Sequence, residues 1–76
     1  MKAATMKERI GLTAGAIWKV LEKTQEVNAS RLPAMVNEKN FVVHQALGWL
    51  AREDKIDYRS EGEKVFVSLL ESERKK

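Results

Sequence analysis

The stretch Asn37 to Ile56, NEKNFVVHQALGWLAREDKI, predicts one amphipathic helix that ends in a charged turn and leads directly into a strand. At 100° per residue, the apolar side chains of Val43, Ala46, Leu47 and Leu50 fall within about 100° of one another. A stripe of this width is typical of a helix that packs one face against a core. The function of the chain therefore depends on what contacts the opposite face.

That opposite face is expected to mix polar and apolar side chains. Six residues are predicted on or beside it: Phe41, Val42, Gln45, Gly48, Trp49 and Arg52. The aromatic and aliphatic members of this set place apolar surface where a helix that binds nucleic acid would have hydrated, basic side chains. The face is thus compatible with two classes of partner, DNA and protein.

Composition indicates an ordinary globular protein. The 76 residues are 43% hydrophobic and 33% charged, with no cysteine and a net charge of +3. This length predicts one domain, with its core in residues 6–70 and a frayed basic tail at 71–76. No apolar run approaches the roughly 20 residues of a membrane-spanning helix, and the N-terminus lacks a signal-peptide pattern, so we expect a cytoplasmic protein and no membrane partner.

Residues 6–25 predict the first helix, because apolar side chains recur there at spacings of three and four. The expected buried stripe consists of Met6, Ile10, Ala14, Ile17 and Leu21. Gly11 and Gly15 lie on one flank of this helix, beside Trp18. Each glycine costs about 1 kcal/mol relative to alanine inside a helix, so their presence predicts a closely packed neighbour, either another helix of the same domain or a second subunit.

A short second helix is expected at residues 30–36. Asn28 or Ser30 can cap it, and Pro33 falls in its first turn, where a missing amide donor costs nothing. Its predicted buried residues are Leu32, Met35 and Val36. The polar turn that follows leads into the long amphipathic helix, with Asn37 or Asn40 as its expected cap. Two helices joined in this way match the helix-turn-helix plan, although the usual glycine of the turn is absent.

The last part of the chain predicts a β-hairpin. Residues 56–60 and 64–70 alternate apolar and polar side chains, and the turn between them contains Gly62. Val27 can form a short third strand at the edge of this sheet. Three helices followed by a hairpin make an α+β fold of the winged helix-turn-helix type.

Two segments carry a resemblance to a known family: GLTAGAIWKVL at residues 11–21 and ALGWLAREDKI at residues 46–56. They resemble the small prokaryotic winged helix-turn-helix domains that form a family of unknown function, and the resemblance covers residues 6–70. Its most specific parts are AGAIW and ALGWLARE. The resemblance implies a helix-turn-helix with a hairpin wing, and a superfamily that includes many DNA-binding regulators. It implies no catalytic residue.

If the domain binds double-stranded DNA, the long helix would lie in the major groove. Asn and Gln side chains suit adenine, whereas basic side chains suit guanine or phosphate. The candidate DNA contacts are Lys19, Lys23, Lys39, Asn40, His44, Gln45 and Arg52. The charge distribution opposes this interpretation in part, because residues 37–54 have a net charge of −1 and residues 55–70 have none, whereas residues 1–25 have +3.

Protein association is the alternative, through a foreign partner or a homodimer. Phe41, Gly48 and Trp49 are the candidate interface residues, because aromatic anchors beside small residues are favoured at protein interfaces. Enzymatic chemistry is not indicated. His44 is the single histidine, no phosphate-binding loop or nucleophile motif is present, and no residue spacing suggests a metal, a cofactor or a small-molecule substrate.

Overall fold

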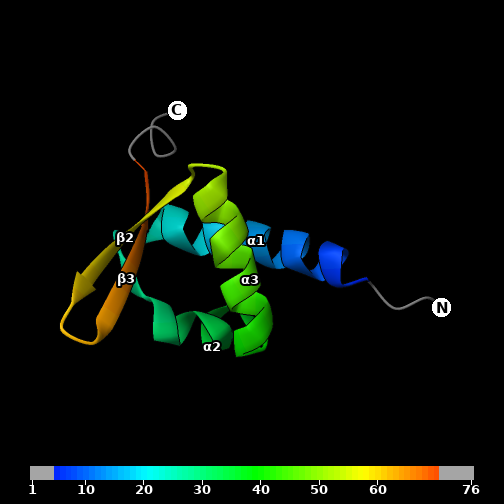
Figure 1. Cartoon of the computed structure of the whole chain (residues 1–76), viewed down its shortest axis with the longest axis horizontal. Helices are drawn as coiled ribbons and strands as arrows, with labels where there is room; N and C mark the ends of the chain where they lie inside the picture. Colours follow the sequence, from blue (N-terminus) through cyan, green and yellow to red (C-terminus); the bar gives the residue numbers. More distant parts are fainter. Residues whose placement is uncertain (1–4, 71–76) are drawn as a thin grey trace.

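The computed structural model describes residues 5–70, so the predicted tail at 71–76 lies outside the described residues. The elements follow the order expected for a winged helix (Figure 1). They are α1 (Met6–Lys23), β1 (Val27–Asn28), the 3₁₀ turn η1 (Ala29–Arg31), α2 (Leu32–Val36), α3 (Asn40–Arg52), β2 (Ile56–Glu61) and β3 (Lys64–Leu69). The predicted α+β fold with three helices and a hairpin wing is confirmed.

Helix α1 begins at a capping box formed by Thr5 and Glu8. The Thr5 hydroxyl accepts a hydrogen bond from the Glu8 amide at 3.1 Å, and the Thr5 amide donates to the Glu8 carboxylate at 2.8 Å. The helix buries Ala14, Ile17 and Leu21. Met6, which the periodicity placed in the same stripe, is exposed, because it lies in the first turn, beyond the core.

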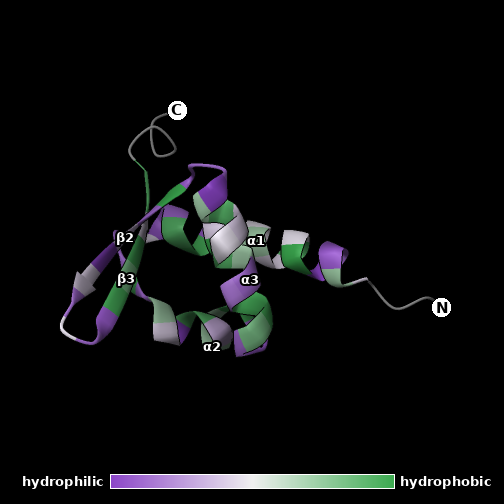
Figure 2. Cartoon of the chain, viewed as in Figure 1, coloured by the Kyte–Doolittle hydropathy of each residue, from purple (hydrophilic) through white to green (hydrophobic). Residues whose placement is uncertain are grey.

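The sheet has three antiparallel strands in the order β1-β3-β2. The short strand expected near Val27 exists, and Val27 pairs with Val67 of β3. Val67 is also the partner of Tyr58 on β2, so β3 is the central strand. Gly62 has a φ of 63° in the hairpin turn, a conformation that glycine adopts without steric cost. Figure 2 shows the hydrophobic colour concentrated along β3 and the hydrophilic colour along much of β2.

One core joins the helices to the inner face of the sheet. Its members come from all the helices and strands except η1, and they include Ile17, Leu21, Leu32, Val43, Leu50, Val67 and Leu69. Helix α3 crosses α1, and the hairpin lies to one side of both (Figure 1). Among residues 5–70, no helix is both long enough and apolar enough to cross a membrane.

The turn between α2 and α3 differs from the prediction in its details. Asn37 does not cap α3; it ends α2 in the left-handed conformation, with φ 55° and ψ 53°. Asparagine tolerates this region better than most residues, so it replaces the glycine that such turns often contain. Lys39 is the N-cap of α3, and its side chain makes no capping hydrogen bond, so the assignment of Asn37 or Asn40 as the cap was wrong.

Helix α2 buries less than expected. Leu32 is fully buried, but Met35 is 48% exposed, so its predicted place in the core was wrong. The helix has only five residues, and one turn and a half can direct few side chains toward the core.

Candidate nucleic-acid interface

Helix α3 presents one face to solvent, and most of the predicted contact residues lie on it. Phe41 is 57% exposed and Trp49 is 48% exposed. The other exposed members are Asn40, His44, Gln45, Gly48 and Arg52. The structure therefore brings most of the polar candidates for DNA and the apolar candidates for protein together on a single helix.

Val42 was wrongly expected on or beside this face. Its side chain is fully buried, together with Val43, Ala46, Leu47 and Leu50. Helix α3 packs against α1, α2 and β2, so its covered arc is wider than the single stripe that periodicity indicates. The apolar character of the exposed face consequently comes from its aromatic residues and Gly48.

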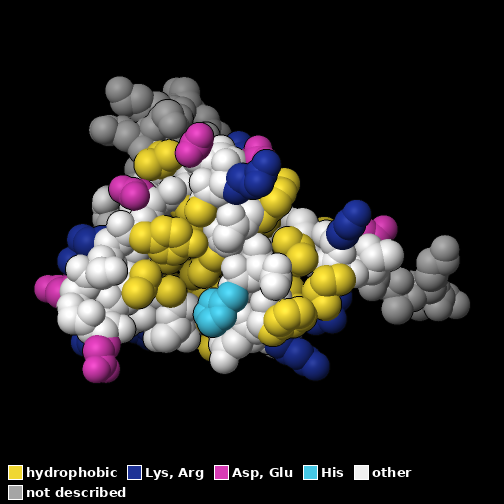
Figure 3. All heavy atoms as spheres, in the orientation of Figure 1, with side chains coloured by type: hydrophobic (Ala, Val, Ile, Leu, Met, Phe, Trp, Pro, Cys, Tyr) yellow, Lys and Arg dark blue, Asp and Glu magenta, His cyan; other side chains and the backbone are white. Residues whose placement is uncertain are grey.

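The space-filling view shows the mixed character of the surface (Figure 3). Hydrophobic side chains form patches across the face of the molecule on which α3 lies, separated by polar atoms. Lys and Arg side chains lie mostly toward the edges of this view. Such a surface has more in common with the core-and-rim pattern of a protein interface than with a continuous basic stripe.

The predicted basic contacts are distributed over two helices. Lys39 is exposed at the N-cap of α3, directly before the first residue of that helix. Lys19 and Lys23 are exposed on α1, on the side opposite to the buried Ala14 and Ile17. The structure thus places Lys39 at the N-terminal end of α3 and the other two lysines on α1.

An ion pair fixes the beginning of α3 to α1. Arg9 donates from Nη2 to Oε1 of Glu38 at 2.8 Å, and the same oxygen accepts the Lys39 amide at 2.9 Å. The hydrogen bond from Arg9 is the main reason that the pKa of Glu38 lies below its ordinary value. Sequence analysis missed this pair because its members are 29 residues apart.

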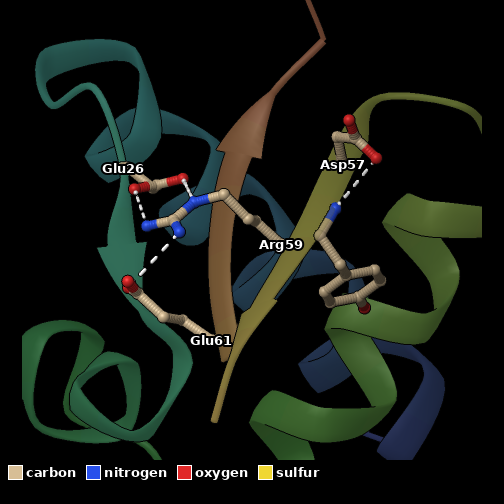
Figure 4. A network of polar contacts seen from close by, with 5 residues as sticks. Glu26, Asp57, Arg59 and Glu61 are labelled. Carbon is tan, nitrogen blue, oxygen red and sulfur yellow. Dashed lines mark hydrogen bonds and ion pairs between the residues drawn. The ribbon is translucent and has the colours of Figure 1, made fainter. Parts of the chain in front are cut away.

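A second polar network covers the outer face of the sheet (Figure 4). Arg59 extends from β2 across β3, where its guanidinium carbon lies 4.6 Å from the ring centre of Phe66. It donates to both carboxylate oxygens of Glu26 at 2.9 Å and to Glu61 at 3.3 Å. These contacts raise the pKa of Arg59 and lower that of Glu26.

This network also affects how the wing can meet a nucleic acid. The charge of Arg59 is already paired inside the domain, and Glu61 and Glu63 flank the turn at Gly62. Lys64 is at the same tip, opposite Glu61, so a phosphate backbone approaching the tip would meet two carboxylates and one lysine. The wing offers little electrostatic attraction for DNA.

The glycines of α1 do not face a neighbour within the domain. A Cβ atom built on Gly11, Gly15 or Gly48 would have no contact within 4 Å. The prediction that another helix of the same domain packs closely against Gly11 and Gly15 was wrong. The two α1 glycines instead line a surface depression of about 300 Å³ between α1 and α3, together with Trp18 and Trp49. A second subunit at this position stays a prediction.

Comparisons with known proteins agree with this geometry. One relative, described as uncharacterized protein MJ1608 of Methanocaldococcus jannaschii, is 34% identical over 64 residues, which cover 80% of this chain and 90% of the relative. The fold is similar to that of HlyU from Vibrio cholerae N16961, with a TM-score of 0.69 at 23% identity over 97% of this chain and 87% of that one. Reduced HlyU gives a TM-score of 0.72 at 22% identity, over 82% of this chain and 65% of that one.

These structural neighbours establish the fold, and the family follows from the sequence. The family model described as a winged helix-turn-helix domain (DUF2582) matches residues 5–69, which include every helix and strand of the structure. The resemblance found in the two segments of α1 and α3 is thereby confirmed. The chain belongs to the DUF2582 family of winged helix-turn-helix domains.

Proposed function

We propose that this domain binds double-stranded DNA through α3 and has a role like that of a transcription regulator, without catalytic activity. The observation that carries the proposal is the exposed polar row on α3, which follows directly after α2 and its tight turn. In a helix-turn-helix, the second helix enters the major groove. Asn40 and Gln45 have the side chains that pair with adenine, and Arg52 suits guanine or phosphate.

The phosphate contacts would come from the ends of α3. Lys39 and Arg52 are 13 positions apart, which places them about 20 Å from each other along the helix axis. His44 lies between them on the exposed side and can contact a phosphate from within the groove. Lys19 and Lys23 would add backbone contacts only if the duplex also passed along α1. With so few cations and an acidic wing tip, we expect modest affinity and a small salt dependence.

Titration of a short labelled duplex at low salt tests the proposal. Asn40→Ala and Gln45→Ala should each weaken binding to a preferred sequence by about 1–3 kcal/mol and relax preference at one base pair. Lys39→Gln should weaken binding to all DNA sequences. It should also reduce the slope of log K against log salt concentration by about one, which corresponds to one counterion fewer released. Glu22→Gln, on the exposed side of α1, is the control.

Reversing the charge of both α1 lysines, Lys19→Glu with Lys23→Glu, shows whether α1 lies along the backbone. A loss of affinity would add α1 to the interface, whereas unchanged binding would confine the contacts to α3. Absence of binding by the unmodified protein at about 50 mM salt would contradict the proposal, since electrostatic attraction is strong under that condition.

Protein association through α3 is the second candidate function. It is favoured by the exposure of Phe41 and Trp49, about two turns apart on the face of α3 that also contains Gly48. Buried aromatic anchors contribute much of the binding energy at protein interfaces. Sedimentation at increasing concentration tests for a homodimer, which Trp49→Ala should abolish without loss of helical signal. A protein that remains monomeric at about 1 mM would leave only a foreign partner for this face.

A further inference from the structure

Trp49 lies at the junction of three adjoining depressions on the surface between α1 and α3. Beyond the depression shared with Gly11, Gly15 and Trp18, it borders one of about 400 Å³ along α3 and one of about 360 Å³ at the start of α1. We refer to the three together as the tryptophan groove. Its α1 side is lined by Lys7, Gly11, Gly15 and Trp18, and its α3 side includes Gly48 and Arg52.

The floor of the tryptophan groove is helix backbone. Gly11, Gly15 and Gly48 have no Cβ atom, and none of them would meet a neighbour within 4 Å if one were added. A partner can therefore approach the backbone of α1 closely between the rings of Trp18 and Trp49. Along α1 the groove extends from Lys7 to Trp18, which is about 16 Å, or three turns of an α-helix.

The charge around the groove has one sign. Lys7, Arg52 and Lys55 line it, and His44 lies among the polar residues of its α3 side. Within residues 5–70, no Asp or Glu lines any of the three depressions. A ligand for this surface thus needs apolar side chains for the floor and negative charge at its margins.

The α1–α3 surface of a second copy does not have that combination. A two-fold dimer would place the same patch of each subunit face to face, so the basic residues of one groove would lie near basic residues of the other. Helix α1 of a copy carries four basic residues and two acidic ones, and α3 carries Arg52 and no acidic residue. Residues 71–76, ESERKK, include no apolar side chain that could fill the groove.

We propose that the tryptophan groove is the docking site for an amphipathic helix of another protein, about three turns long, whose apolar face is flanked by Asp and Glu. Helix-in-groove binding uses apolar anchors at positions i, i+3, i+4 and i+7, which suit a floor between two tryptophan rings. The acidic flanks would meet Lys7 and Arg52 at the margins. This surface is distinct from DNA binding in its α1 half, so it can exist whether or not α3 contacts a duplex.

The chain offers a direct probe of this site, because its two tryptophans, Trp18 and Trp49, both line the groove. The indole N–H signals in a ¹⁵N-correlation spectrum therefore report on the groove alone. The ligand is a designed helical peptide without tryptophan, with leucine at the anchor positions and glutamate on both flanks. Its matched control has lysine in place of every glutamate. We expect the glutamate peptide to shift both indole signals and to bind about tenfold more tightly than the lysine peptide, with the difference shrinking as salt is added.

Filling the floor provides the blocking variant. Gly11→Leu with Gly15→Leu, or Gly15→Leu alone, introduces side chains into open space on α1 and improves helix propensity, so the fold should be retained. The double variant should weaken peptide binding by about tenfold or more while leaving DNA binding by α3 unchanged. Leu12→Ala removes an exposed apolar side chain that does not line the groove, and should leave peptide binding as it was.

Four results would overturn the proposal. These are no shift of either indole signal by the glutamate peptide up to about 1 mM, equal affinity for the two peptides, undiminished binding by the double leucine variant, or indole signals that change on dilution of the protein alone. The last result would assign the groove to a second copy of the chain. Failure of DNA binding in the duplex titration would leave the groove proposal intact.

Discussion

The guanidinium of Arg59 binds both carboxylate oxygens of Glu26, a residue 33 positions earlier in the chain. Its side chain passes over the ring of Phe66 on the way, so one residue connects β2, β3 and the segment that enters β1. The planar guanidinium group of arginine suits this geometry, whereas a lysine ammonium cannot donate the same pair of parallel hydrogen bonds. The arrangement therefore ties the three strands together on the outer face of the sheet.

We expect Arg59→Lys to lower the urea midpoint of unfolding even though the positive charge is kept. Combining it with Glu26→Gln in a double-mutant cycle should show coupling, since each substitution removes the same contact. Glu61→Gln is the matched control, because the Arg59–Glu61 contact is longer, at 3.3 Å. Additive effects of Arg59→Lys and Glu26→Gln would show that the pair does not act as a unit.

Acid should destabilise the domain through Glu26 and Glu38. The pKa of each carboxyl lies below its ordinary value of 4.5, mainly because of the hydrogen bond from its arginine partner. A lowered folded-state pKa means that the stabilisation is complete above 4.5 and is lost as the pH falls through the lower, folded-state value. Urea unfolding between about pH 3 and pH 7 measures this dependence.

The variants Glu26→Gln and Glu38→Gln separate the two contributions to that acid dependence. Each should flatten the decline of the unfolding free energy at low pH, because it removes one titrating group that binds protons less readily when folded. Glu22→Gln on the exposed side of α1 is the control. A decline of equal slope in all the variants would place the acid sensitivity elsewhere in the domain.

The left-handed turn at Asn37 should depend on the residue that occupies it. Asn37→Ala places a Cβ in a strained backbone region and should reduce the unfolding free energy by about 1 kcal/mol. Asn37→Gly should preserve or slightly raise stability, since glycine adopts a φ of 55° without that cost. Thermal unfolding followed by circular dichroism measures the difference, and equal midpoints for the two variants would contradict it.

Glycines in open helical positions should behave differently from the glycine of the hairpin. Gly15→Ala and Gly48→Ala add a methyl group to open space and should each raise the unfolding free energy by about 1 kcal/mol. Gly62→Ala should lower it by a similar amount, because its φ is 63°. A destabilising effect at Gly15 in urea unfolding would indicate a neighbour at that surface.

The sequence sufficed for the order and type of the elements. Periodicity placed α1 and α3, alternation placed the hairpin, and Val27 was named as a residue that can form a short edge strand. The errors came from residues whose burial depends on neighbouring elements. Val42 is covered because α3 has neighbours on several sides, and Met35 is exposed because α2 is too short to fix its own orientation.

The candidate site was predictable as a list of residues and less so as an arrangement. The side chains of α3 follow from helical geometry, so Asn40, Gln45 and Arg52 were placed on its exposed side in advance. The ion pair of Arg9 with Glu38 joins residues 29 positions apart, and no local pattern indicates it. The depression lined by Gly11 and Gly15 was also missed, because a glycine in a helix is compatible with either a close neighbour or none.

The position of β3 in the sheet has a consequence for how the domain is made. This strand is the last described element in the chain, yet it lies between β1 and β2, which pair with it and not with each other. The pairing of β1 therefore cannot form until Val67, the partner of Val27 and 40 residues later in the chain, has been synthesised. During synthesis, the three helices would leave the ribosome before β3. The three-stranded sheet would then form in one late step. Amides of both outer strands should consequently exchange with solvent through the same opening event.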